Sequence, residues 1–581
     1  MKELTFHLMD FHRREAKPQY WALYDRQQMT YEERLDDDLC IAGCELVRQG
    51  PVPDHPALNQ YTYRYPEQEF KLRTGSQCLD VDTLLNLGEI EVDYDKKEVS
   101  FQISKKREAP PQNMDFGEGW PIPTGKLEGA VDRYVDDYLL SLKGNENRYA
   151  AVTSFLKKEN PKIKGLSKGK PLVEEDPNSK TWLPKIIETI ANMQKSCLFI
   201  QGPPGAGKTY TGSHIILALL AQGKKVGVTS NSHKVINHLL GAVEKEAKKV
   251  GQVFRGVKKS TGGNDDTLHM GEQIINETTN EKAIGKITNG YCQLIAGTAW
   301  LFADANIDQQ LDYLFIDEAG QVSLANLVAV GTSAKNIVLL GDQMQLAQPI
   351  QGVHPGQSGL SALDYLLEGN ATVPPEKGIF LPTTFRLHPD VCGFISEAVY
   401  DGRLKPEKRT AKRVLVLEGN ADPALAPSGI RYVPVQHDGC SRFSEEEIQR
   451  VSEIYTSLLK MSYVNDEGVQ KPMKKENILV VSPYNMQVNK LKDVLPKDAR
   501  VGTVDKFQGQ EAEAVIISMA TSSADFLPRN IEFLFSKNRL NVAVSRAKCL
   551  AILLANPALL TIPCKTPEQM ALVNTLCWVA Q

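Results

Sequence analysis

One stretch decides the fold: Cys197-Leu198-Phe199-Ile200-Gln201-Gly202-Pro203-Pro204-Gly205-Ala206-Gly207-Lys208-Thr209. Its first four residues form a short apolar run, which is typical of a buried strand. Apolar residues from Ser213 to Ala221 predict a helix, and Gly223 is placed to end it. Between the strand and the helix, residues 202–209 match the pattern G-x-x-x-x-G-K-S/T. A strand, a glycine-rich turn and a helix in this order predict a phosphate-binding loop.

The residue types of this loop suit a nucleoside triphosphate and its metal ion. Glycines let backbone N–H groups close around phosphate oxygens, and the helix N-terminus adds partial positive charge. We expect Lys208 to reach the β- and γ-phosphates of ATP, and the Thr209 hydroxyl to bind Mg²⁺. The predicted nucleotide-binding residues of this loop are Gly202, Pro203, Pro204, Gly205, Ala206, Gly207, Lys208, Thr209 and Tyr210.

Two carboxylates follow a second apolar run. Asp317 and Glu318 come directly after Leu311–Ile316, so a buried strand would place both at the carboxyl edge of its sheet, where ligands bind. Asp317 can hold Mg²⁺ directly or through water, and Glu318 can orient and deprotonate an attacking water. An isolated Asp-Glu pair is more often a solvated strand end. Together with the phosphate-binding loop, the pair predicts a triphosphate hydrolase.

Short apolar strands continue to alternate with helices along the chain. This pattern predicts an α/β fold with two doubly wound parallel sheets, in domains at 166–360 and 361–581. Residues 245–292 are polar and lack strand runs, so we expect a helical or loop insertion there in the first domain. The further predicted strands are Val226–Thr229, Leu314–Ile316, Ile337–Leu340, Ile478–Val481, Val515–Ser518 and Leu550–Leu554.

The N-terminal part follows different patterns. Residues 1–48 are charged and predict helix. Within 49–125, apolar residues alternate with polar ones at 90–94 and again at 99–103, which predicts a β-hairpin in a small all-β module. Two helical patterns follow within 126–165, and packing into a core is their simplest interpretation.

Composition sets outer limits on function. At about 150 residues per domain, 581 residues hold roughly three to four domains. The net charge of −4 argues against a histone-like, globally basic binder, although local basic patches remain open. Ten cysteines are scattered without a CxxC pair, which favours reduced thiols over a zinc site. We find no apolar run near the roughly 20 residues of a membrane span and no secretory signal, and so expect a cytoplasmic protein without membrane contact.

The chain resembles the superfamily 1 helicases, in the branch that includes the nonsense-mediated-decay RNA helicase and the replication nuclease-helicase. The resemblance covers about residues 195–556 and rests on motifs in the family's order. These motifs are 202–209 (motif I), Val228-Thr229-Ser230-Asn231 (Ia), Gly297-Thr298-Ala299 (Ic), 317–321 (II), Gly341-Asp342-Gln343-Met344-Gln345-Leu346 (III), Phe385-Arg386-Leu387-His388-Pro389, Ser482-Pro483-Tyr484-Asn485-Met486-Gln487, 504–511 (V) and 538–547 (VI).

This resemblance implies two RecA-like domains with ATP bound between them. Arg386 and Arg546 of the second domain would reach the γ-phosphate, where guanidinium spreads phosphoryl charge. Gln345 would couple the γ-phosphate to domain closure. Phe385, in place of the usual Tyr, would stack on adenine, and Glu511 would accept a hydrogen bond from ribose.

One departure concerns the base. The branch carries an adenine-reading Gln upstream of motif I, and Leu183–Gln194 offers no clear equivalent, because Gln194 lies too close to the strand. Other nucleoside triphosphates are therefore candidate substrates.

The resemblance extends to the N-terminal part, where relatives carry a small β-barrel on two stalk helices; it assigns these to 49–125 and 126–165. His12–Pro18 with Tyr20-Trp21 is similar to the linker after a RecB-type nuclease in bacterial nuclease-helicase fusions. The nuclease's own carboxylate–lysine motif is absent, so we expect the helicase part of a longer protein or a nuclease partner.

Relatives contact the nucleic-acid strand through motifs that correspond here to Ser230, Asn231, Thr298, His388 and Thr503. Hydroxyls, amides and backbone N–H groups hold phosphate without reading sequence. Basic clusters occur at 105–107, 245–249, 258–259 and 471–475, and a solvated face is the common role of such clusters. Of these we expect only Lys248–Lys259 to contact the strand.

These patterns predict an ATP-dependent helicase or translocase, acting as a monomer and moving 5′→3′ on single-stranded DNA, with RNA as an alternative substrate. A second hypothesis is a nucleic-acid-stimulated NTPase switch that remodels protein or ribonucleoprotein complexes without unwinding a duplex. A third is a nucleic-acid scaffold with an inactive NTPase site, against which the intact Lys208, Asp317, Glu318, Arg386 and Arg546 argue.

Overall fold

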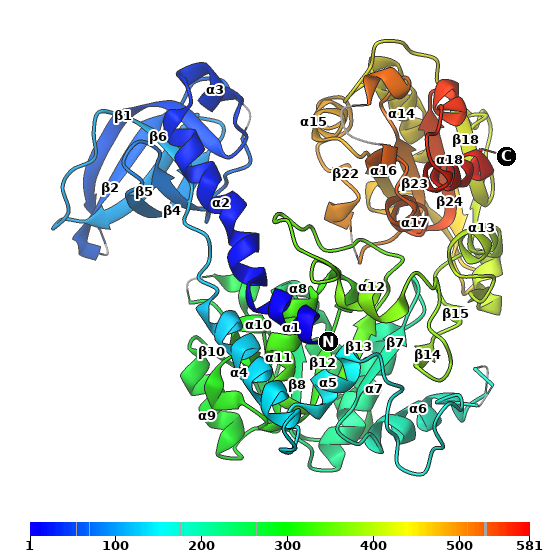
Figure 1. The fold of residues 1–581 in the computed structure, drawn as a ribbon. Coiled ribbons are helices and arrows are strands. Elements are labelled where there is room, and N and C mark those ends of the chain that lie inside the picture. Colours follow the sequence, from blue (N-terminus) through cyan, green and yellow to red (C-terminus); the bar gives the residue numbers. More distant parts are fainter. Residues whose placement is uncertain are drawn as a thin grey trace. The chain divides into compact units, whose positions relative to one another are not determined.

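The protein is described by a computed structural model covering residues 1–53, 55–68, 70–174, 176–177, 179–262, 264–507, 509–527 and 531–580. The chain divides into two compact units (Figure 1). The large unit comprises Gly129–Pro349 and Leu360–Gln581 together with Met1. The N-terminal unit comprises Lys2–Glu128 and, from the middle of the chain, Ile350–Gly359. No helix among the described residues has the length and apolar character that crossing a membrane requires.

The first sheet of the large unit has eight parallel strands in the order β10-β9-β11-β8-β12-β13-β7-β14. Its central strands are apolar and fully buried, as expected for a parallel sheet covered on both faces. The strands are β7 (Cys197–Gln201), β8 (Val226–Thr229), β9 (Gly256–Lys259), β10 (Ile274–Glu277), β11 (Leu294–Gly297), β12 (Leu311–Ile316), β13 (Ala334–Gly341) and β14 (Gly378–Phe380).

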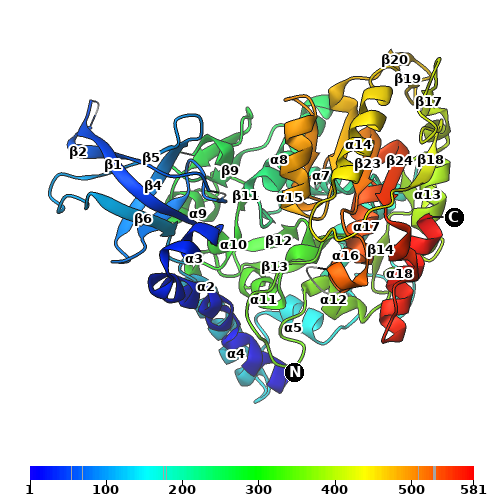
Figure 2. The ribbon, with the colours of Figure 1, turned by 90° about the horizontal axis from the view of Figure 1, so that it is seen from above.

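Helices lie on both faces of this sheet. Figure 2 shows α7 and α8 on one side of β12 and β13 and α5 and α11 on the other. The helices of this part are α4 (Gly125–Ser141), α5 (Ala150–Leu156), α6 (Trp182–Ala191), α7 (Lys208–Ala221), α8 (His233–Val250), α9 (Asn280–Thr288), α10 (Ala299–Phe302), α11 (Leu324–Gly331) and α12 (Ala362–Leu367). Apolar side chains of α6, α7 and α8 pack on the strands in one continuous core.

A second parallel sheet follows, in the order β18-β24-β23-β21-β22. Apolar residues of α14 and α15 pack on its strands, and α13 and α17 contact β24. Its strands are β18 (Gly429–Pro434), β21 (Ile478–Val481), β22 (Arg500–Gly502), β23 (Ala512–Ser518) and β24 (Ala547–Ala555). Its helices are α13 (Pro389–Val399), α14 (Glu445–Leu458), α15 (Asn485–Val494), α16 (Ile531–Leu534), α17 (Lys537–Val544) and α18 (Pro567–Val579). Two RecA-like parallel-sheet domains are thus confirmed.

Two sequence expectations about these sheets are wrong in detail. Residues 245–292 are not a helical or loop insertion, because β9 and β10 extend the first sheet at one edge. The first sheet also passes residue 360, since β14 pairs in parallel with β7. The edge strands of this sheet are β10 and β14. The sequences of β9 (Gly-Val-Lys-Lys) and β10 (Ile-Ile-Asn-Glu) are short and partly polar, so no run of apolar residues marks them.

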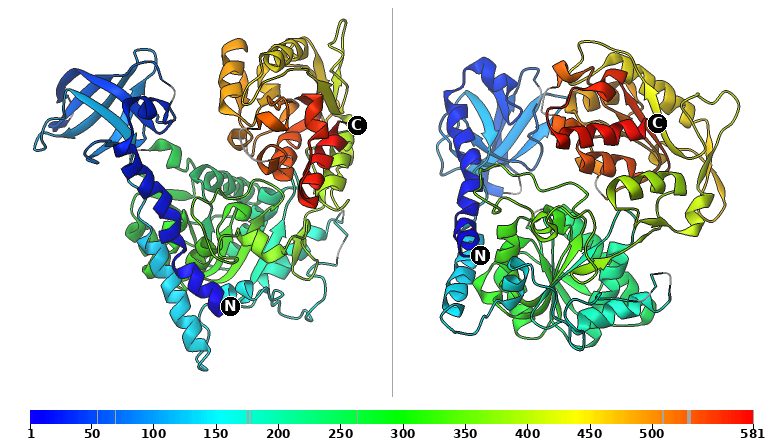
Figure 3. Two further views of the ribbon diagram at one scale, coloured as in Figure 1. Left: turned by 45° about the horizontal axis from the view of Figure 1, so that its top comes forward. Right: turned by 45° about the vertical axis from the view of Figure 1, so that its right-hand side comes forward.

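The N-terminal unit contains an antiparallel barrel. Six strands pair in the order β1-β2-β5-β4-β3-β6, and β6 closes on β1. They are β1 (Cys40–Val52), β2 (His55–Arg64), β3 (Gln77–Asp80), β4 (Asn86–Asp93), β5 (Glu98–Ser104) and β6 (Asn113–Glu118). The prediction of helix for residues 1–48 is wrong at its C-terminal end. The helices there are α1 (Lys2–Met9), α2 (Phe11–Gln28) and α3 (Tyr31–Asp36), and β1 begins at Cys40. In both views of Figure 3 the helical segment formed by α1 and α2 leads away from the barrel, while α3 packs against β1.

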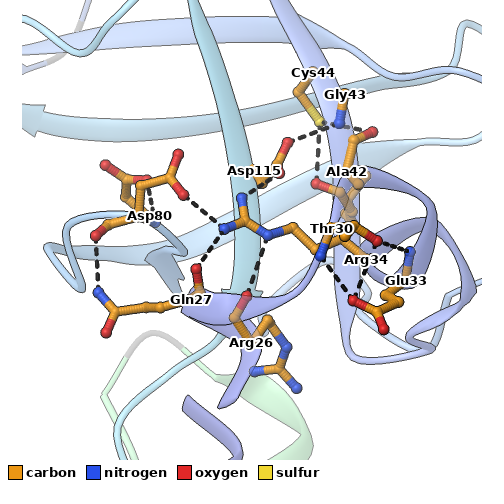
Figure 4. Close-up of polar contacts among 12 residues, drawn as sticks. Arg26, Gln27, Thr30, Glu33, Arg34, Ala42, Gly43, Cys44, Asp80 and Asp115 are labelled. Carbon is orange, nitrogen blue, oxygen red and sulfur yellow. Dashed lines mark hydrogen bonds and ion pairs between the residues drawn. The ribbon is translucent and has the colours of Figure 1, made fainter. Parts of the chain in front are cut away.

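Arg34 joins the helices to the barrel (Figure 4). Its guanidinium pairs with Asp115 and with Asp82, each at 2.8 Å, and donates to the carbonyls of Arg26 and Gln27 at 3.2 and 3.1 Å. The Arg34 side chain is 11% exposed, so these charges are largely removed from water. Arg34 therefore fixes α3, the end of α2, strand β6 and the turn after β3 to one another.

The internal segment 350–359 is held by α2 through contacts that we call the α2 clasp. The Glu15 carboxylate accepts from the N–H groups of Gln351 (2.8 Å) and Gly352 (3.0 Å) and lies 2.7 Å from His354 Nε2. The Phe11 ring stacks on His354 with centroids 4.2 Å apart. Residues distant in sequence thus form one part of the N-terminal unit.

Candidate nucleotide and nucleic-acid sites

The phosphate-binding loop lies between β7 and α7, as its pattern predicts. Gly205 and Gly207 have φ angles of 73° and 81°, in the left-handed region that favours glycine. A Cβ on Gly202 would lie 2.0 Å from Lys208 Cγ, so only glycine fits there. The Lys208 ammonium donates to the Gly202 carbonyl at 2.6 Å. The loop therefore holds its lysine close to its own backbone, where a phosphate can replace the carbonyl.

A segment leading to the second sheet packs on this loop. The Thr384 hydroxyl donates to the Pro204 carbonyl, and the Phe385 N–H donates to the Gly205 carbonyl, both at 2.9 Å. A Cβ on Gly205 would lie 2.5 Å from Arg386 Cβ. The Phe385 side chain is half exposed beside the loop, which suits the stacking role that the resemblance implies.

The acidic pair follows β12 at the carboxyl edge of the sheet. Asp317 is buried, and its carboxylate accepts from the Glu318 N–H at 2.9 Å. Burial and the Glu318 carboxylate raise the pKa of Asp317, while the Lys208 ammonium opposes this shift. Glu318 has a φ of 54°, a strained backbone conformation that concentrates at functional sites. A buried carboxylate with a raised pKa is stabilised by a cation, which fits a metal ligand.

Thr209 and Asp317 suit Mg²⁺ in their chemistry, because both offer oxygen ligands. Thr209 is half-buried in the first turn of α7, and the fields of Lys208 and Glu318 both act on Asp317. Within the described ranges, no three or more His, Cys, Asp or Glu side chains are grouped to hold a metal. Mg²⁺ bound here would take its remaining ligands from phosphate oxygens and water, as it does in many phosphoryl-transfer sites.

Arg546 lies at the end of α17 and is 2% exposed. Its Nε and Nη1 donate to the carbonyls of Val542 (3.2 Å) and Gln510 (3.1 Å). Its Nη2 is buried without a hydrogen-bond partner among the residues that the structure describes. Burial and then Arg386 lower the pKa of Arg546 to about 9, and Glu318 opposes them, so the guanidinium stays charged at neutral pH. This is a buried cation with one uncommitted donor.

Arg386 and Glu511, for which the resemblance implies separate roles, form an ion pair at 2.6 Å. Glu511 also pairs with Lys548 at 3.1 Å. Burial alone would raise the pKa of Glu511, but Arg386 and Lys548 outweigh it and lower the pKa to about 2. The ribose contact of Glu511 stays a prediction, because the carboxylate is already engaged by two cations. Lys548, in the strand after motif VI, was missed by sequence reasoning.

The residues predicted to hold nucleic acid divide between the two sheets. Ser230 and Asn231 follow β8 and Thr298 follows β11, the neighbouring strand, so these three share one carboxyl edge. The Ser230 hydroxyl is buried without a partner among the described residues. Thr503 follows β22 in the second sheet. His388 is 7% exposed and caps α13, accepting from the Asp390 N–H at 3.2 Å, so its ring has a structural role.

The prediction that Lys248–Lys259 contacts the nucleic-acid strand is wrong at one position. Lys258 is fully buried in β9, with its ammonium 3.1 Å from His233 Nδ1 and donating to the Thr267 carbonyl. Burial lowers the pKa of Lys258 to about 8. Lys248 and Lys249, at the end of α8, are exposed.

Gln508, in the motif V stretch, lies outside the described residues.

Sequence reasoning also missed residues that hold motif III. Gln345 donates to the Asp342 carboxylate at 2.9 Å, and the amide of Asn538 in α17 donates to the Gln343 and Gln345 carbonyls at 3.0 and 2.6 Å. Asn538 belongs to the motif VI stretch, but its residue type alone gives no signal of these partners.

Comparison with known proteins adds independent findings. Two models described as AAA domain match residues 184–357 and 360–558. The DNA polymerase alpha-associated DNA helicase A of Schizosaccharomyces pombe is 26% identical over 404 residues, covering 61% of this chain and 60% of that protein. A Regulator of nonsense transcripts 1 homolog of Arabidopsis thaliana is 26% identical over 409 residues, covering 64% of this chain and 32% of the relative.

The match to the DNA replication ATP-dependent helicase/nuclease JHS1 of Arabidopsis thaliana includes most of the chain. It is 22% identical over 553 residues, 87% of this chain and 39% of that protein. The chain thus spans less than two thirds of each of these relatives. With the ordered motifs and the two parallel sheets, these matches support a superfamily 1 helicase, of the branch that includes regulator of nonsense transcripts 1 and the replication helicase/nucleases.

Proposed function

We propose that the chain is an ATP-dependent helicase that moves 5′→3′ along single-stranded DNA. The observation that carries this proposal is the buried Arg546 guanidinium, whose Nη2 has no partner among the described residues. A buried donor without an acceptor is costly. Arg546 lies in the electrostatic field of Glu318 and of Arg386, and Arg386 itself packs against Gly205 of the phosphate-binding loop. The γ-phosphate of ATP supplies the acceptor and the negative charge that this site lacks.

In the proposed reaction, each charged group has one task. Lys208 balances the charge of the β- and γ-phosphates, while Arg386 and Arg546 spread the charge that develops on the transferred phosphoryl group. Glu318 orients the attacking water and takes its proton. Thr209 and Asp317 would hold Mg²⁺, which would supply neutralisation of the phosphate charge.

Translocation follows if hydrolysis changes how the two sheets hold a strand. Ser230, Asn231 and Thr298 on the first sheet and Thr503 on the second offer hydroxyl, amide and backbone groups to phosphates. Such contacts do not depend on base identity, so binding would be independent of sequence and strongly salt-dependent. Alternation between open and closed states would advance the chain along the strand.

Nucleotide choice follows from the base contact. The half-exposed Phe385 ring can stack on any base, because every base offers an aromatic face. Without a clear upstream Gln, we propose that GTP and other triphosphates are also hydrolysed.

DNA is the proposed substrate because two of the relatives reported above are named for DNA replication or a DNA polymerase. RNA is the alternative, since a third is named for nonsense transcripts. We further propose that the chain acts as a monomer beside a nuclease domain or partner, in a reducing, cytoplasmic environment. The ten cysteines, all free thiols, support the last point.

The test is steady-state ATP hydrolysis at low salt without nucleic acid, with single-stranded DNA and with single-stranded RNA of matched length. We expect stimulation by DNA and, in strand-separation assays, unwinding of 5′-tailed but not 3′-tailed duplexes. Stimulation by RNA alone would move the substrate to RNA. Stimulated hydrolysis without strand separation on either duplex would favour the NTPase switch, and no stimulation by either polymer would overturn the translocase.

A further inference from the structure

A buried hydrogen-bond node lies behind motif III, at residues to which the proposed function gives no task. The Asp342 carboxylate accepts from the Tyr400 hydroxyl at 2.6 Å and from the Gln345 amide at 2.9 Å, both through Oδ2. Asp342 is 3% exposed and Tyr400 is fully buried. The Tyr400 hydroxyl in turn accepts from the Asn541 amide at 3.0 Å.

The protons of this node have one consistent arrangement. A carboxylate only accepts, so Tyr400 must spend its single hydroxyl proton on Asp342 and can only accept from Asn541. Burial and Asp342 raise the pKa of Tyr400 well above its ordinary value, which keeps the phenol protonated. The same carboxylate fixes the Gln345 amide, because only its NH₂ side can face Asp342. Tyr400 therefore helps decide which way Gln345 points.

The node also holds the backbone of motif III. Asn541 donates to the Met344 carbonyl at 2.7 Å as well as to Tyr400. One turn earlier in α17, Asn538 donates to the carbonyls of Gln343 and Gln345. Three successive carbonyls of motif III are thus held from one helix.

Two short elements connect the node to the two arginines. Tyr400 is the residue that caps the C-terminus of α13, and Arg386 lies just before this helix begins. Asn541 is in α17, whose last turn leads directly to Arg546. The two helices contact each other. A shift of Gln345 at the γ-phosphate can therefore reach both arginines through rigid helices.

We propose that Tyr400 is a positioning residue that couples Gln345 of motif III to Arg546 of motif VI through Asp342 and Asn541. The inference rests on the proposed ATPase function and adds to it the way in which the γ-phosphate is sensed. Tyr400 would not touch the nucleotide. It would hold Gln345 and α17 in fixed positions relative to each other, so that binding of the γ-phosphate by Gln345 also fixes the position of Arg546.

The experiment is a double-mutant cycle between Tyr400→Phe and Gln345→Ala. We expect Tyr400→Phe to lower kcat about tenfold, the effect of removing one hydrogen bond to a charged group, and to raise KM for ATP by a smaller factor. If Tyr400 acts through Gln345, the double variant will be no slower than Gln345→Ala alone. The matched control is Tyr313→Phe, which removes a buried hydroxyl donating to the Ile190 carbonyl at 3.0 Å and should leave kcat unchanged.

Binding gives a second readout that needs no turnover. The ratio of the Kd for ADP to the Kd for a slowly hydrolysed ATP analogue measures recognition of the γ-phosphate, and it should fall in Tyr400→Phe but not in Tyr313→Phe. If Tyr400→Phe does not fold, Asn541→Ala in the same cycle tests the same link, because it removes the amide that joins Tyr400 to Met344.

The outcomes separate the inference from the proposed function. Additive effects of Tyr400→Phe and Gln345→Ala on kcat and on the Kd ratio, or a change in KM alone, would overturn the coupling. A wild-type chain that binds the analogue but never hydrolyses ATP would overturn the proposed function, and the cycle in binding would still decide whether the node senses the γ-phosphate.

Discussion

At the scale of single residues, Lys208 has the role that is simplest to test. Lys208→Ala should lower ATP turnover at least about a hundredfold, because it removes the cation that balances the phosphates while the loop backbone stays intact. Steady-state hydrolysis measures this change. Lys497→Ala, at an exposed position, is the matched control and should hydrolyse normally. Near-normal ATP hydrolysis by Lys208→Ala would show that residues 202–209 do not form the active site.

Glu318→Gln should separate ATP binding from hydrolysis. The amide keeps the size of the side chain but cannot take a proton from water, so binding should persist and turnover should stop. The variant should therefore stay on a labelled single strand in the presence of ATP, with a much slower release than the wild type. Normal hydrolysis by this variant would show that Glu318 is not the base.

Lys258 should make stability depend on pH. Its folded-state pKa of about 8 lies below the ordinary value of 10.5, so between these values the unfolded chain binds more protons than the folded one. Stability should therefore rise with pH in this window, by at most about 1.4 kcal/mol per pH unit, relative to Lys258→Met. Urea unfolding of both proteins at pH 7.5, 8.5 and 9.5 measures the difference. A difference independent of pH would contradict a buried ammonium at this position.

The residue scale also shows where sequence reasoning ends. Lys208, Asp317 and Arg546 could be singled out because their motifs have fixed order and spacing. The pairing of Arg386 with Glu511 could not, since 125 positions separate them. Lys258 was misassigned for a related reason. A lysine in a polar stretch is usually exposed, but here the sheet and the loop that covers it bury the side chain.

At the scale of elements, Arg34 should control how α3 is held on the barrel. Arg34→Ala leaves Asp115, itself 13% exposed, without its cation, so we expect about 3 kcal/mol of destabilisation. Thermal unfolding followed by circular dichroism measures the loss. Arg13→Ala is the matched control, since the Arg13 side chain is 69% exposed in its pair with Asp10 and should change stability little. Equal losses of stability in the two variants would show that Arg34 does not hold α3 on the barrel.

Most central strands were predictable from sequence, but β9, the buried β11 and the edge strands were not. β7, β8 and β21 are continuous apolar runs because both faces are covered. β9 (Gly-Val-Lys-Lys) and β10 (Ile-Ile-Asn-Glu) contain too few apolar side chains to mark a strand, although most of β9 is buried. The start of β1 was missed for a different reason, because its buried apolar residues directly follow a charged helical segment.

At the scale of the whole molecule, the α2 clasp should protect the internal segment 350–359. Glu15→Ala removes the acceptor of two backbone N–H groups and the partner of His354, so we expect faster cleavage before Ile350 and Val353 by thermolysin. Mass spectrometry of the fragments locates the cuts. Glu3→Ala, at an exposed position in α1, is the control, and unchanged cleavage in Glu15→Ala would contradict the clasp.

Membership of 350–359 in the N-terminal unit has a consequence for modularity. An accessory domain that is continuous in sequence can be gained, lost or exchanged by a single recombination event. This one cannot, because its structure includes a stretch encoded just after motif III. A chimera that takes residues 2–128 from a relative must also take the matching internal stretch. Otherwise the residue at position 15 and the segment 350–359 come from different proteins and need not match. Exchange of the barrel among relatives is therefore constrained by a patch of sequence far from the barrel itself.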